Sequence, residues 1–209
     1  MKTVIPLFCL IYTFTSLFAY AQNNLSESGS RERDYNKFLV RQLDSIYVND
    51  QTPREQLHTQ HNLSSAEMNR LIAAMNLNDS INLVKIKAIL DQYGWLGPDV
   101  IGNSGNQTLF LVIQHADLKA QEKYLPMMKE AVKNGKARGS HLALLIDRIE
   151  MYNGRPQVYG SQLSGENGKY KFYKILDEVN VNKRRVAVGL KPLEEYAKEF
   201  NIKYKPLKK

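Results

Sequence analysis

Apolar residues recur at steps of three and four along most of this chain, and this spacing limits the possible folds more than any other feature of the sequence. One stripe includes Phe38, Leu39 and Ile46, and another includes Leu71 and Met75. Such spacing gathers apolar side chains on one face of an α-helix, and that face must be buried against a partner. The sequence therefore predicts a mainly helical domain.

Capping residues and glycines place the ends of the first helices. Ser64 followed by Glu67 is a capping box, which predicts a helix start. Asp79 or Ser80 is expected to restart a helix that ends at Gly94.

The second half of the chain mixes helices with strand-forming segments. Three glycines and Pro98 predict a loop over residues 95–105, and the apolar run 109–113 is interpreted as a buried helix. Further helices are expected over residues 118–134, 140–152, 182–188 and 191–200. Residues 157–163 and 169–175 predict a β-hairpin. The expected class is α+β, mainly α, a bundle-like helical domain with a C-terminal β-hairpin.

The first 21 residues predict export. Lys2 precedes an apolar run, and Ala19-Tyr20-Ala21 offers the small-x-small pattern that a signal peptidase cleaves. Cleavage near Ala21 would deliver the mature chain to the periplasm or the extracellular space. Residues 22–79 are expected to form a flexible leader and a helical extension, and residues 80–209 a single domain.

The cysteine content excludes several kinds of site from the expected mature chain. Cys9 is the single cysteine and lies in the expected signal peptide. The mature chain would therefore have no disulfide, no thiol nucleophile and no zinc–thiolate site. No later segment approaches the roughly 20 apolar residues that a transmembrane helix needs.

Positive charge is concentrated at the C-terminus. Residues 22–168 carry 16 basic and 16 acidic side chains, whereas residues 183–209 carry nine basic and three acidic ones, a balance of +6. A basic end attracts anionic lipids or envelope polymers over about 10 Å. An exported protein has little access to nucleic acid, so no nucleic-acid partner is expected.

His115 is the central candidate for chemistry. Imidazole titrates near neutrality, so His115 could act as a general base oriented by Asp117 or Asp147, or it could simply bond a carbonyl group in the core. With His141 and a carboxylate it would make a two-His-one-acid metal set. The 25 intervening residues are not diagnostic of such a site. We therefore expect no metal and no cofactor.

Asp147 lies on the second apolar face of helix 140–152, where a carboxylate must be paired or hydrogen-bonded. Arg148, Arg184 and Arg185 are the cations available to it. A buried ion pair between helix and hairpin is the structural alternative to a functional role.

Uncharged amide and phenol groups suggest recognition of a polar ligand such as a sugar or a peptide. Gln157, Tyr159 and Gln162 surround Gly160 on the first expected strand, and such groups bind ligands without ionising. The alternative is that Tyr159 packs on the central helix. Two further amides near His115 are also candidate ligand-binding groups: Gln114 and Gln121.

These motifs resemble a bacterial domain family of unknown function that is frequent in exported proteins. The resemblance covers roughly residues 80–205 and implies that the polar positions belong to one constellation, but it implies no activity. Ser161 stands where threonine is expected. The strings that carry the resemblance are Gly94-Trp95, Gln114-His115-Ala116-Asp117, Asp147-Arg148, Gln157-x-Tyr159-Gly160-x-Gln162 and Arg184-Arg185-x-x-x-Gly189-Leu190.

Three functions remain open from the sequence. The chain could be a hydrolase or transferase that uses His115 as acid or base. It could be a non-catalytic module that binds a polar cell-envelope ligand. Alternatively, the polar network could serve only to stabilise the fold.

Overall fold

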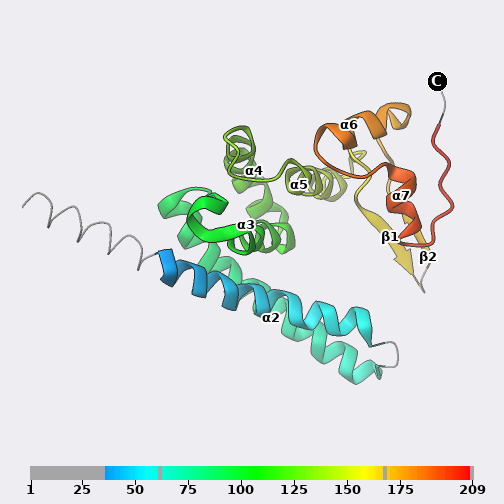
Figure 1. Cartoon of the computed structure of the whole chain (residues 1–209). Coiled ribbons are helices and arrows are strands. Elements are labelled where there is room, and N and C mark those ends of the chain that lie inside the picture. Colours follow the sequence, from blue (N-terminus) through cyan, green and yellow to red (C-terminus); the bar gives the residue numbers. More distant parts are fainter. Residues whose placement is uncertain (1–35, 61–62, 167–168, 208–209) are drawn as a thin grey trace, which may run out of the picture. The chain divides into compact units, whose positions relative to one another are not determined.

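The computed structural model describes residues 36–60, 63–166 and 169–207 and divides the chain into two compact units, Met1–Gln42 and Leu43–Lys209. The described residues 36–42 of the first unit are helical. The second unit begins with helical residues 43–59, named helix 43–59 below, and contains all the remaining described elements (Figure 1). The expected signal peptide lies outside the described residues.

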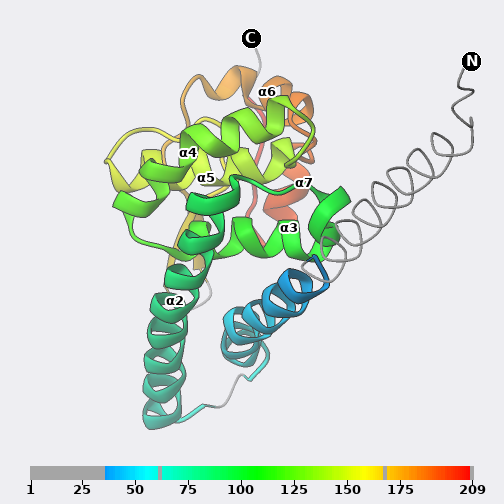
Figure 2. The ribbon, with the colours of Figure 1, turned by 90° about the vertical axis from the view of Figure 1, so that its left-hand side faces the viewer.

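Helix 43–59 lies beside the long helix α2, Ser65–Tyr93 (Figure 2). The predicted capping box of Ser64 and Glu67 is present, and α2 ends before Gly94 as predicted. The expected restart of a helix at Asp79 or Ser80 is wrong. Helix α2 continues through both residues: the carboxylate of Asp79 is bound by Arg54, and the Ser80 hydroxyl donates to the Asn76 carbonyl oxygen one turn earlier in the same helix.

Helix α3 runs from Pro98 to His115 and begins inside the segment predicted to be a loop. Proline suits the first turn of a helix because its missing N–H is not needed there. A kink at Gly102, with φ of +71°, accounts for the glycine in this segment. The buried helical assignment of residues 109–113 is confirmed.

Helices α4, Leu118–Lys133, and α5, Gly139–Tyr152, pack against each other and against α3. Their ends agree with the prediction to within a residue. The fully buried apolar side chains shared by these three helices include Leu109, Ile113, Tyr124, Met128 and Leu145. This core fixes the C-terminal end of α3, where His115 lies.

The C-terminal part contains the predicted antiparallel hairpin, but with shorter strands: β1, Leu163–Glu166, and β2, Lys169–Phe172. Residues 157–162 are not a regular strand, because their backbone bends around the carboxylate of Asp147. The remaining elements are η1, Glu178–Asn180, α6, Val181–Ala187, and α7, Leu193–Lys198.

The described part of the chain is therefore mainly α with a small β part, as predicted. Among the described residues, no helix combines the length and apolar character needed to cross a membrane.

Candidate functional site

His115 is hydrogen-bonded to a carboxylate from a distant part of the chain. The ring lies at the C-terminal end of α3, and its Nδ1 is 3.0 Å from Oδ1 of Asp50 on helix 43–59. The side chain of Asp50 is 1% exposed and that of His115 is 17% exposed. A buried acid thus holds a histidine that solvent can still reach.

Arg54 fixes the position of Asp50. It lies one turn later on the same helix, where its Nη1 donates to the Asp50 carbonyl oxygen at 2.6 Å and lies 3.4 Å from Asp50 Oδ1. Its Nη2 is 2.8 and 2.7 Å from the two carboxylate oxygens of Asp79 on α2. Three segments of the chain therefore meet at one cluster: Asp50, Arg54, Asp79 and His115.

Burial alone would raise the pKa of Asp50, because a dry environment disfavours its charge. The hydrogen bond and charge of His115, together with the charge of Arg54, outweigh burial and hold the pKa of Asp50 below its usual value. Asp50 is therefore a carboxylate at neutral pH.

The same cluster has the donor atoms of a metal site. One ligand atom each from Asp50, Asp79 and His115 lies within 4.8 Å of the others. Carboxylate and imidazole ligands of this kind suit several divalent transition metals. The guanidinium of Arg54 already contacts both carboxylates, so a divalent ion would have to displace it.

The two carboxylates expected to orient His115 have other partners. Asp117 caps α4 by accepting from the Ala120 N–H at 2.8 Å. Asp147 is 0% exposed and accepts from the N–H groups of Val158, Tyr159 and Ser161 at 2.7, 2.9 and 2.8 Å. Burial raises the pKa of Asp147, and these three donors act in the opposite direction.

Asp50 was missed in the sequence analysis because residues 22–79 were set apart from the site. A clue was available. Leu43, Ile46 and Asp50 lie at steps of three and four on one helix face, so Asp50 is a carboxylate on an apolar stripe. Such a group needs a partner of opposite charge or a hydrogen-bond donor.

Four predicted polar residues are joined by hydrogen bonds around the carbonyl oxygen of Gln114, the residue before His115: Gln114, Gln121, Arg148 and Gln162. Arg148 Nε donates to Gln162 Oε1 at 3.0 Å, and Arg148 Nη1 donates to the Gln114 carbonyl oxygen at 2.9 Å. The Gln121 amide donates to that same carbonyl oxygen at 3.1 Å and to the Ala116 carbonyl oxygen at 2.9 Å.

The other predicted residues hold the backbone of residues 157–162. Gln157 Nε2 donates to the Gln162 carbonyl oxygen at 3.1 Å. Arg184 Nε donates to the Val158 carbonyl oxygen at 2.8 Å, and Arg185 Nη1 to that of Tyr159 at 2.7 Å. Their bonds reach main-chain atoms, so these contacts shape the segment.

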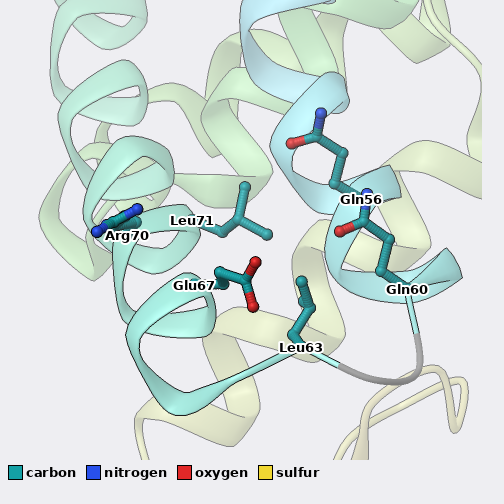
Figure 3. A pocket seen from close by; sticks show the side chains of 6 residues that line it. All are labelled: Gln56, Gln60, Leu63, Glu67, Arg70 and Leu71. Atoms are coloured by element: carbon teal, nitrogen blue, oxygen red, sulfur yellow. The ribbon is translucent and has the colours of Figure 1, made fainter.

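Two surface hollows lie in the described part of the chain, and neither lining includes His115 or Tyr159. One, of about 270 Å³, lies between the end of helix 43–59 and the start of α2 (Figure 3). Its lining residues are Gln56, Gln60, Leu63, Glu67, Arg70 and Leu71. The other, of about 300 Å³, is lined by side chains that include Tyr93, Trp95, Met127 and Lys136.

A family model described as "Family of unknown function (DUF6624)" matches residues 38–208. The match begins well before residue 80, so it includes Asp50 and Asp79, which the resemblance drawn from motifs left out. No curated protein and no solved structure matches the chain.

Proposed function

We propose a function for this chain on the basis of its side chains. The chain belongs to the DUF6624 family, a family of unknown function. The protein is a hydrolase or transferase in which His115 transfers protons and Asp50 orients it. The observation that carries this proposal is the 3.0 Å contact between His115 Nδ1 and a carboxylate that is 1% exposed.

The pairing prepares the ring for acid–base chemistry. In the tautomer in which Nδ1–H donates to Asp50, the lone pair of Nε2 is free to accept a proton from a nucleophile. Protonation makes an imidazolium, which the adjacent carboxylate stabilises. The lowered pKa of Asp50 keeps that carboxylate charged while His115 cycles.

Arg54 and Asp79 support this pair without taking part in proton transfer. Arg54 contacts both carboxylates, which holds Asp50 at a fixed distance from α2. We assign both residues to positioning.

Export is part of the proposal. The pattern of residues 1–21 supports cleavage near Ala21 and release to the periplasm or the extracellular space. The substrate would then be a polar molecule of the cell envelope. Among the predicted groups, Arg148 bonds to Gln162 and to the carbonyl oxygen of Gln114, the residue before His115, and we assign it to holding that molecule.

The test measures turnover by the mature chain, residues 22–209, against chromogenic esters, phosphoesters, amides and glycosides. His115→Ala is expected to lower kcat/KM by about 10²-fold or more, the usual contribution of a general base. Asp50→Asn should lower kcat by at least tenfold because Asp50 orients the ring. His58→Ala, which changes an exposed histidine, is the matched control and should keep wild-type activity.

Wild-type kcat/KM in a folded His115→Ala variant would refute the catalytic role. A chain that binds a glycan or peptide but turns over none of the four substrate classes would favour the second candidate, a binding module. The observation that favours this candidate is that, among the described residues, Arg148 is bonded only to neutral acceptors, the Gln162 amide oxygen and the Gln114 carbonyl oxygen, groups that bind polar partners without ionising.

A further inference from the structure

Arg148 is a partly buried cation whose partners are neutral. Its Nε and Nη1 donate to an amide oxygen and a carbonyl oxygen, and within residues 36–60, 63–166 and 169–207 it forms no ion pair. Removing a guanidinium from water costs free energy that neutral acceptors only partly return. Arg148 therefore carries a charge that no acidic side chain of the described residues balances.

A second guanidinium adds to this imbalance. Burial is the largest effect on the pKa of Arg148 and lowers it, Tyr152 and Tyr196 raise it, and the positive charge of Arg54 lowers it. Arg54 is itself part of the cluster that holds His115 through Asp50.

Other arginines of the chain show what a satisfied guanidinium looks like. Arg155 is paired with Glu150 through two contacts of 2.5 and 2.9 Å. Arg185 is 2% exposed, but it uses its donors on three carbonyl oxygens. Arg148 instead makes two bonds, and a guanidinium offers five N–H donors in a planar fork.

We propose that Arg148 binds an oxyanion of the substrate, a carboxylate or a phosphate, beside His115. A guanidinium fork binds two oxygens of such a group at once, which supplies both charge and orientation. Arg148 contacts the carbonyl oxygen of Gln114, the residue that precedes His115. A substrate whose oxyanion is bound by Arg148 would place the bonds next to that charged group near the imidazole of His115.

This inference rests on the proposed function, since it names the substrate class of the same site. It can nevertheless be tested without turnover. Inorganic phosphate and acetate are titrated separately into the mature chain at constant ionic strength set with chloride, and binding is followed by calorimetry. Phosphate binding alone identifies a phosphate site, and acetate binding alone a carboxylate site.

We expect a dissociation constant in the millimolar range for at least one of the two anions. Arg148→Gln should weaken that binding more than tenfold, and Arg148→Lys, which keeps the charge but loses the fork, about three- to tenfold. Arg155→Gln is the matched control because Arg155 is exposed and paired with Glu150. Its affinity should stay within twofold of wild type.

If the wild type binds neither anion, or if Arg148→Gln binds as tightly as wild type in a folded chain, the oxyanion site is refuted. That result would not change the interpretation of a loss of turnover in His115→Ala, which tests the proposed function separately. Conversely, anion binding that depends on Arg148, combined with full turnover in His115→Ala, refutes the proposed function and retains the oxyanion site.

Discussion

Both amide atoms of Asn82 are buried without a hydrogen-bond partner, and the side chain is 0% exposed. Each unsatisfied polar group costs about 1–3 kcal/mol relative to its hydrated state. We therefore predict that Asn82→Leu, a change of similar volume, raises the free energy of unfolding by about 1–2 kcal/mol in urea denaturation.

Asn106 provides the opposite case for the same substitution. It is also buried, but its amide nitrogen donates to the carbonyl oxygens of Leu96 and Lys136 at 2.8 and 2.7 Å. Asn106→Leu should destabilise the chain by about 2 kcal/mol because it leaves two acceptors without a donor. If Asn82→Leu were as destabilising as Asn106→Leu, Asn82 would have partners in solution.

Burial of His141 makes the free energy of unfolding depend on pH. Its ring stacks on Phe110 with centroids 4.2 Å apart, and its Nδ1 is buried without a partner. Burial, followed by the charge of Arg138, lowers the pKa of His141 to about 4. In the unfolded chain the pKa is near the model-peptide value of about 6.5.

Because the unfolded chain binds the extra proton between these two values, stability is complete above pH 6.5 and is lost as the pH falls towards 4. We predict a loss of about 1–3 kcal/mol across this range, and His141→Phe should remove it. Urea unfolding at pH 7 and pH 4.5 measures the difference. The exposed His58→Phe variant should retain the wild-type slope, and an unchanged slope in His141→Phe would contradict the assignment.

The place of His115 at a helix end was predictable from the sequence, but the carboxylate that contacts its ring was not. Asp117 was expected to orient the His115 ring because it lies two residues away in the sequence. In the structure its carboxylate caps α4. A contact with Asp50, 65 residues away, depends on how helices pack, and a single sequence does not contain that information.

At the level of elements, residues 157–162 are organised by the carboxylate of Asp147 on α5. Asp147→Asn replaces one acceptor oxygen by an NH2 group that faces backbone N–H donors. We predict a loss of about 2–4 kcal/mol in the free energy of unfolding, measured in urea.

The matched control for this variant is Asp91→Asn. Asp91 is 49% exposed and pairs with Lys123, so its substitution should cost much less stability than that of Asp147. Equal losses for the two variants would show that Asp147 does not organise the segment.

Helix ends set by local chemistry were predictable, and those overridden by distant contacts were not. The capping box of Ser64 is formed by residues three apart, so the sequence contains all of it. There is no helix boundary at Asp79: α2 continues through this residue, and its carboxylate binds Arg54, 25 residues away. The strand expected at residues 157–162 fails for the same kind of reason.

For the whole molecule, charge is distributed unevenly along the chain. Residues 183–209 carry nine basic and three acidic side chains. We predict that the mature protein sediments with vesicles containing anionic lipid at 50 mM salt and is released near 0.5 M salt, where charges are screened beyond about 4 Å. Lys203→Glu together with Lys205→Glu should weaken this binding, whereas Lys85→Glu with Lys87→Glu should have a smaller effect. Equal effects would place the attraction elsewhere.

The i, i+4 relation of Asp50 and Arg54 has a consequence for tracing relatives of this chain. Adding or deleting one residue between them would rotate the later side chain by about 100° about the helix axis and separate the pair. Homologues that keep this chemistry should therefore tolerate insertions before or after these five positions but not within them. A D-x-x-x-R string upstream of a Q-H-A-D string is thus a compact search pattern for proteins with the same arrangement.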